Sequence, residues 1–114
     1  MTQRITDLTL SGSSGYTYTF LVYPLGTAFK SLPGVYVVTR RHPKLFDPGF
    51  EHSILYFGET EDLSTRFDNH HKAASFRRNN ANCIGVLLEG CIDEVARRAI
   101  ESDLVMHWNP CCNG

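Results

Sequence analysis

The stretch from Leu32 to Arg66 constrains the fold more than any other part of the chain. Two short apolar runs within it, Val35 to Thr39 and Ser53 to Phe57, are rich in β-branched and aromatic residues and have the length of strands. Proline, aspartate and glycine separate them, which is typical of a connecting loop. After the second run, a helical pattern opens over about 61–74, with Arg66 in its early turns. The stretch therefore predicts two paired strands followed by a helix.

The remaining segments complete an α+β pattern. Alternating residues over 5–10 and 16–23 predict an N-terminal β segment, either a hairpin or a strand at a sheet edge. A third core strand is expected over 83–89, after a turn-like polar segment at 76–82, and a helix capped by Asp93 over 93–108. We expect a small three-stranded antiparallel sheet (34–39, 53–58 and 83–88) flanked by helices 61–74 and 93–108. The buried stripe of the last helix is expected to comprise Ala96, Ala99, Ile100, Leu104 and Trp108.

Length and composition indicate one domain of 114 residues, with residues 1–32 as an N-terminal β extension packed on a domain of residues 33–114. The chain is 42% hydrophobic and 20% charged, without an apolar run that approaches the roughly 20 residues of a membrane span. The N-terminus lacks the apolar region of a secretory signal, so we expect a cytoplasmic protein with no membrane contact. Its cysteines are expected to be free thiols.

Several short motifs follow one another in a specific order along the chain. Gly34-Val35-Tyr36 is followed by Tyr56-Phe57-Gly58, and then by Arg66, His70, a glutamate in the last predicted helix and Pro110-Cys-Cys-Asn113. This order resembles the GIY-YIG endonucleases, over roughly residues 33–113. The resemblance implies a metal-dependent endonuclease that hydrolyses DNA phosphodiester bonds by water attack, with Mg²⁺ or Mn²⁺ as cofactor. The positions that match the family are Tyr36, Tyr56, Gly58, Arg66, His70, Glu101 and Asn113.

The chain departs from the family pattern at three positions. Val35 and Phe57 stand where isoleucines are usual, and Glu59 stands where some members carry a lysine. The last change removes a cation that would lie near the reaction centre. The first two are exchanges of one apolar residue for another, so they leave the predicted strands intact.

Hydrolysis of a phosphodiester builds negative charge on phosphorus and on the leaving oxygen, and therefore requires fixed positive charge. Arg66 suits this role because a guanidinium holds two phosphate oxygens at once. The plainer alternative is an exposed ion pair with Asp62. Glu101 falls among apolar helix residues, where an unpaired carboxylate is costly. Its partner is either Arg97 or, as the resemblance implies, a metal ion.

The two tyrosines, the histidine and the asparagine allow more than one role. Tyr36 and Tyr56 would be ordinary sheet aromatics if taken singly, but on neighbouring strands they place two phenols over one phosphate. Tyr36 and His70 are equally suited to be the general base. Asn113 either holds a phosphate or a water through its amide or caps a loop.

Positive charge is local rather than general, since the formal net charge is −1. The residues expected to contact a nucleic-acid backbone are Arg40, Arg41, Lys44, Lys72, Arg77 and Arg78. His107, Cys111 and Cys112 are zinc-ligand types without the usual zinc spacing. The expected partner is DNA, and one alternative is that this DNA is branched or otherwise structured. A protein partner or a second copy of the chain would supply specificity for the DNA. The alternative from another class is a non-catalytic module that binds nucleic acid or protein and retains the GIY-YIG fold.

Overall fold

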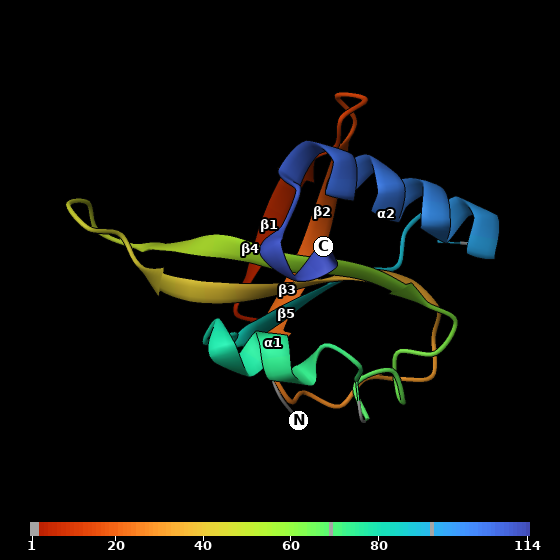
Figure 1. Ribbon diagram of the computed structural model, residues 1–114, viewed down its shortest axis with the longest axis horizontal. Helices are drawn as coiled ribbons and strands as arrows, with labels where there is room; N and C mark the ends of the chain where they lie inside the picture. The colour runs from red at the N-terminus through yellow and green to blue at the C-terminus, as the bar shows by residue number, and fades with distance from the viewer. Residues whose placement is uncertain (1–2, 69, 92) are drawn as a thin grey trace.

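The computed structural model describes residues 3–68, 70–91 and 93–114. It confirms an α+β fold, in which five strands form one antiparallel sheet that curls into a half-barrel in the order β1-β2-β5-β3-β4 (Figure 1). The elements in chain order are β1 (Thr6–Ser11), β2 (Thr17–Pro24), β3 (Gly34–Pro43), β4 (Phe50–Thr60), α1 (Ala73–Arg78), β5 (Cys83–Leu87), α2 (Glu94–Trp108) and the 3₁₀ turn η1 (Cys111–Asn113).

Strand β3 forms the centre of two apolar layers. Val35 and Val37 point to one face of the sheet and pack in a cluster with Leu104 of α2. Tyr36 points to the other face and packs in a cluster with Phe76 of α1. This arrangement follows from the alternation of side chains along a strand, and it explains why β3 is apolar at every position of its first half.

The sheet has five strands rather than the three that the sequence analysis predicted. The expected N-terminal hairpin is confirmed, because β1 and β2 pair antiparallel, and β2 then pairs with β5. Every residue of β5 is buried and β5 also pairs with β3, so it needs a neighbour on each side. The N-terminal segment supplies the second neighbour.

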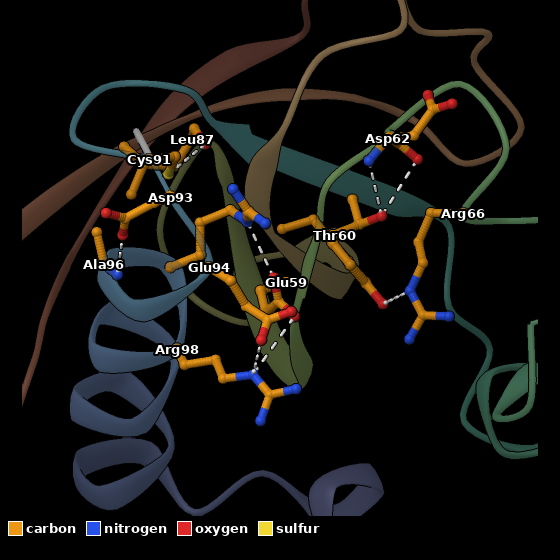
Figure 2. A network of polar contacts seen from close by, with 12 residues as sticks. Glu59, Thr60, Asp62, Arg66, Leu87, Cys91, Asp93, Glu94, Ala96 and Arg98 are labelled. Carbon is orange, nitrogen blue, oxygen red and sulfur yellow. Dashed lines mark hydrogen bonds and ion pairs between the residues drawn. The ribbon is translucent and has the colours of Figure 1, made fainter.

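The helix predicted over 61–74 is wrong: the described residues between Glu61 and Lys72 form turns, and α1 covers only Ala73–Arg78. Local side-chain hydrogen bonds compete with the helix here. Thr60 Oγ1 accepts from the Asp62 amide at 3.1 Å (Figure 2). Asp62 Oδ1 accepts from the Ser64 amide at 2.9 Å. The prediction of a turn at 76–82 is confirmed only in part: residues 76–78 belong to α1, whereas Asn79 and Asn80 form a turn.

Strands β3 and β4 run further than predicted. They pair from Gly34↔Thr60 out to Pro43↔Phe50, with a register shift after Val38, so most of the expected loop at 40–52 is a two-stranded ribbon. The prediction that Tyr36 and Tyr56 lie on adjacent strands is confirmed.

Helix α2 is close to the prediction. The Asp93 carboxylate accepts from the Ala96 amide at 2.8 Å, which confirms the expected cap. Its buried stripe is narrower than expected, because Ala99 and Trp108 are exposed while Leu104 is fully buried. Among the helices of the described residues, none is long and apolar enough to span a membrane.

A buried ion pair fastens α2 to β4. Arg97 is only 5% exposed, and its Nε donates to Glu59 Oε1 at 2.9 Å. The alternative in which Arg97 pairs with Glu101 is therefore wrong. An arginine inside an apolar stripe is stable only with such a counter-charge, and the partner lies on a strand that helical spacing cannot reveal.

We expect Glu59→Gln to lower the free energy of unfolding by about 3 kcal/mol, because it leaves the Arg97 guanidinium buried without a counter-charge. Adding Arg97→Met in the same chain should restore most of the loss, since a thioether needs no partner. Urea denaturation of the two variants and the wild type measures both effects. A wild-type midpoint for Glu59→Gln would show that the pair does not hold α2.

Candidate active site

The two tyrosines of the motifs lie on one face of the sheet. Tyr56 stands opposite Val38, while Tyr36 stands opposite Gly58, and the two rings are 6.1 Å apart between centroids. A Cβ atom on residue 58 would collide with the ring and hydroxyl of Tyr36. Gly58 is therefore the surface on which the Tyr36 ring lies, which gives a physical reason for glycine two residues after Tyr56.

Arg66 and His70 meet at the Tyr36 hydroxyl oxygen. Arg66 Nε donates to it at 3.1 Å, and His70 Nε2 lies 2.8 Å from it. The sequence analysis placed these two residues one above the other on a helix. Instead, the turns between β4 and α1 bring them to the same phenol from different directions. The side chains converge as expected, although the secondary structure that positions them is different.

The hydrogen bonds of His70 fix its tautomer. Its Nδ1 accepts from the backbone amide of Lys72 at 3.0 Å, and a backbone N–H can only donate. The proton of the neutral ring is therefore on Nε2, and His70 donates to Tyr36. Burial, followed by the charges of Arg66, His71 and Lys72, lowers the pKa of His70 to about 4, so the ring stays neutral near pH 7.

Tyr36 consequently accepts two hydrogen bonds, which occupies both lone pairs of a neutral phenol. Its side chain is fully buried. Burial is the main cause that raises its pKa above the ordinary value of 10.0, followed by Tyr56, while Arg66 acts in the opposite direction. Burial also raises the pKa of Tyr56, against the Arg66 charge and the Tyr36 hydroxyl. Both phenols are protonated near pH 7.

An open cleft of about 820 Å³ lies beside these residues, between β4, the turns after it, α2 and η1. Tyr56, Arg66, Glu101 and Asn113 line it, so four of the predicted site residues share one cavity. Tyr36 and His70 lie behind this wall and reach the cleft through their contacts with Arg66 and Tyr56.

Glu101 is half-buried at the wall of the cleft. Burial raises its pKa first, the Glu59 carboxylate raises it further, and Arg98 and Arg66 oppose the shift. No hydrogen bond or ion pair of the Glu101 carboxylate appears among the described residues. A half-buried carboxylate beside two cations and without a direct partner is available to a ligand.

Asn113 has a structural task in the structure. Its Oδ1 accepts from the Phe57 amide and its Nδ2 donates to the Phe57 carbonyl, both at 2.8 Å. These two bonds fasten η1 along the open edge of β4. Of the two roles predicted for this amide, the structural one is therefore occupied in the protein as it stands.

Arg98 also belongs to the cleft, although it is not among the site residues predicted from the sequence. It lines the cleft and lies 3.4 Å from Glu94 and 3.9 Å from Glu59 across the groove between α2 and β4 (Figure 2). The available signal was its spacing of three residues from Glu101, which puts both on one side of a helix. Glu59 stands where some members of the family carry a lysine. In the structure its carboxylate pairs with Arg97 and lies 3.9 Å from Arg98, so these two arginines supply positive charge there.

The predicted nucleic-acid contacts fall into two groups. Lys72, Arg77 and Arg78 lie at α1, where Lys72 Nζ donates to the Gly114 carbonyl at 3.3 Å. Arg40, Arg41 and Lys44 lie on the ribbon of β3 and β4. The first group lies at α1, and the second lies on β3 and the turn that follows it.

The donor set fits a divalent cation that keeps several waters. Glu101 supplies one hard oxygen ligand, which suffices for Mg²⁺ when water and substrate phosphate complete its shell. Within residues 3–68, 70–91 and 93–114, no group of three or more His, Cys, Asp and Glu side chains is arranged to hold a metal ion. Cys111 and Cys112 are free thiols. The residues therefore suit a loosely held Mg²⁺ or Mn²⁺ rather than an all-protein cage.

Comparison of the chain with models of known families, with curated proteins and with solved structures gives no match.

We expect Gly58→Ala to displace the Tyr36 ring and to cost about 1–3 kcal/mol of stability, the usual range for overpacking a core. The displacement should also break the hydrogen bonds to Arg66 and His70. In a Tyr36→Ala background the same substitution should cost little, because its Cβ then meets empty space. A thermodynamic cycle of the four proteins measures this coupling, and additive effects would contradict the contact.

Proposed function

We propose that the protein is a metal-dependent endonuclease of the GIY-YIG type, which hydrolyses DNA phosphodiester bonds by attack of water. The observation that carries the proposal is the convergence on one cleft of a buried phenol pair, an arginine and a half-buried carboxylate from β3, β4, the turns after β4 and α2. These are the groups that phosphoryl hydrolysis requires: fixed positive charge, a proton acceptor and a ligand for a hard cation.

Arg66 binds the scissile phosphate in this proposal. Its Nε is held by the Tyr36 hydroxyl, so the guanidinium plane is fixed before substrate arrives. The terminal nitrogens at the wall of the cleft contact two phosphate oxygens. Arg98 adds a second cation across the cleft, partly neutralised by Glu59 and Glu94. Positive charge that is already oriented stabilises the transition state without reorganisation.

The tyrosine pair, rather than His70, takes the proton of the attacking water. Both ring nitrogens of His70 are engaged, and Nε2 carries the proton, so this residue has no lone pair to offer. A phenolate in the pair accepts the water proton to become a phenol, and the hydroxide attacks phosphorus. The P–O bond to the leaving oxygen breaks, and this oxygen takes a proton from solvent. Arg66 and His70 both donate to the Tyr36 oxygen, and both hydrogen bonds strengthen when that oxygen is charged. His70 is thus a positioning residue.

Glu101 holds the divalent cation in this proposal. When bound, Mg²⁺ or Mn²⁺ offsets the negative charge that develops on the leaving oxygen. The Glu101 carboxylate lies partly out of water and close to Glu59. Both conditions raise its pKa, and both favour the binding of a cation beside it.

A second candidate function is a non-catalytic module that binds nucleic acid or protein. Two observations favour it. The amide of Asn113 is hydrogen-bonded to Phe57 and is therefore not available to hold a phosphate. Glu101 is the one carboxylate of the cleft without an arginine partner among the described residues, so a metal ion would have a single carboxylate ligand. The two candidates differ in whether a covalent bond is broken.

We expect Glu101→Gln to reduce cleavage of DNA about a hundredfold or more, the effect of removing one group that stabilises charge in the transition state. The amide is nearly the same size as the carboxylate but is a poor ligand for a hard divalent ion. DNA affinity should fall far less than the cleavage rate, and the melting temperature should stay the same or rise, because burying a neutral group is easier. Cleavage with and without Mg²⁺, DNA binding and thermal melting are measured on one preparation.

The matched control is Glu89→Gln, which changes an exposed glutamate away from the cleft. It should cleave at the wild-type rate. If Glu101→Gln also cleaved at that rate, the metal assignment would be wrong. If neither the wild type nor the control cleaved DNA, the binding module would be the better account.

We expect the cleavage rate to rise about tenfold per pH unit between pH 7 and 9, because the phenolate fraction rises in that proportion below the raised pKa of the pair. A histidine base with a pKa of about 4 would already be deprotonated throughout, and the rate would be flat. The measurement is single-turnover cleavage at saturating Mg²⁺ across this range.

Two substitutions of His70 separate its possible roles. His70→Gln keeps an N–H donor close to the position of Nε2 and should retain most of the rate and the same slope with pH. His70→Ala removes the donor and should slow cleavage about tenfold, the loss of one hydrogen bond to a charged oxygen. Equal losses in both variants would indicate that the ring itself exchanges the proton.

A further inference from the structure

The ribbon formed by residues 40–51, called here the arm, projects beyond the rest of the sheet (Figure 1). Strand β5 accompanies β3 only as far as Thr39↔Cys83. Next to Cys83, the Asn82 side chain clamps the backbone of Arg41: Asn82 Oδ1 accepts from the Arg41 amide at 2.7 Å, and Asn82 Nδ2 donates to the Arg41 carbonyl at 2.9 Å. Beyond this clamp the arm pairs with itself, out to Pro43↔Phe50 and a turn closed by Lys44 N and Gly49 O at 3.0 Å.

The tip of the arm is apolar and faces solvent. Leu45 is 84% exposed and Phe46 is 93% exposed, and they are adjacent in the chain. Phe50 at the base of the turn is 51% exposed. A two-stranded ribbon gains little stability from its own residues, so large apolar side chains at its tip serve contact with something else.

The flanks of the tip carry more positive than negative charge. Arg40, Arg41 and Lys44 are cationic, against Asp47 and Glu51. The Arg41 guanidinium lies 3.7 Å from the centre of the Phe50 ring, and the Glu51 carboxylate lies 3.9 Å from His42. An exposed aromatic side chain between cations is the combination that binds unpaired bases: the ring stacks and the cations contact phosphates.

The arm also lies in line with the cleft. Strand β4 is an edge strand that pairs only with β3, and it runs from Tyr56 at the cleft to Phe50 at the arm. At ~3.3 Å per residue this is about 20 Å. A DNA strand advances ~3.4 Å per nucleotide, so a strand laid along β4 reaches Phe50 about six nucleotides from the phosphate held by Arg66, and Phe46 lies beyond that point.

We infer that Phe46 stacks on an unpaired base about six or more nucleotides from the cleaved bond, so that the preferred substrate is DNA with an interrupted duplex. The inference rests on the proposed function for the position of the cleaved bond. Arg40, Arg41 and Lys44 hold the backbone on either side of that base. Fully paired DNA lacks an accessible base face and binds through the phosphate contacts alone.

The test uses Phe46→Ala in the full-length chain, with Val95→Ala as a matched control because Val95 is also an exposed apolar residue, at 78%. Both changes are made in the Glu101→Gln protein, so that binding is measured without cleavage. The probes are a paired duplex and duplexes with three unpaired nucleotides at increasing distance from one fixed end, with 2-aminopurine as the central unpaired base. Fluorescence reports stacking, and titration reports affinity.

Phe46→Ala should weaken binding of the interrupted duplex about tenfold, the effect of losing one stacked base, and leave the paired duplex unchanged. Phe46→Trp should restore the affinity, and Val95→Ala should have no effect. In cleavage-competent protein, the cut site should follow the unpaired base at a constant separation.

Failure of the inference can be told apart from failure of the proposed function. If the wild type cleaves DNA and Phe46→Ala treats every substrate as the wild type does, the stacking role is wrong and the nuclease stands. If no DNA is cleaved but Phe46 still quenches the probe, the stacking role stands and hydrolysis is wrong. If Phe46→Ala changes sedimentation from dimer to monomer without affecting DNA, the tip is a protein contact and the inference is overturned.

Discussion

The candidate site depends on one buried oxygen atom, the hydroxyl of Tyr36. It receives Arg66 at 3.1 Å and His70 at 2.8 Å, and it lies against the bare backbone of Gly58. An oxygen that accepts two hydrogen bonds in a buried place fixes the positions of both donors, since each would lose its partner if it moved. The turns after β4, which have little regular structure, are thereby tied to the centre of the sheet.

Two polar contacts on different sides of α2 hold this helix beside the same site. The buried pair of Arg97 with Glu59 joins it to β4. Further along the helix, the Asp103 carboxylate accepts hydrogen bonds from the Ser14 amide and the Tyr18 hydroxyl, both at 2.8 Å. Glu101 lies between these two points, so its place at the cleft is determined by contacts with strands that are distant from one another in the sheet.

Much of the fold follows from local patterns in the sequence. The alternation around Tyr36 and Tyr56 and the cap at Asp93 were sufficient to predict β3, β4 and α2, because strand and helix periodicity act over a few residues. The joining of all five strands in one sheet was not predicted, since the pairing of β2 with β5 joins segments that are far apart in the chain. The helix at 61–74 failed because side-chain hydrogen bonds around Asp62 stabilise turns more than the apolar spacing stabilises a helix.

The sequence predicted which side chains come together better than it predicted their arrangement. Spacing placed Arg66 and His70 on one helix face, whereas the structure joins them through a third residue. The task of Asn113 could not be read from the sequence, because an amide that grips the backbone of Phe57 has no sequence signature. Arg97 was one of the two partners expected for Glu101, because the counter-charge on Glu59 lies on another element.

The charges of the cleft explain why these residues are useful together. Glu59 and Glu101 repel one another, and burial adds to the rise in the pKa of Glu101, while Arg66 and Arg98 reduce it. A phosphate entering such a cleft is attracted by the two arginines and repelled by the Glu101 carboxylate. That repulsion disappears only if Glu101 is protonated or shares a cation with the phosphate. In the nuclease that we propose, phosphate and cation would strengthen each other's binding, because each supplies charge that the other needs. A single available carboxylate would then hold a cation firmly only when the phosphate is present.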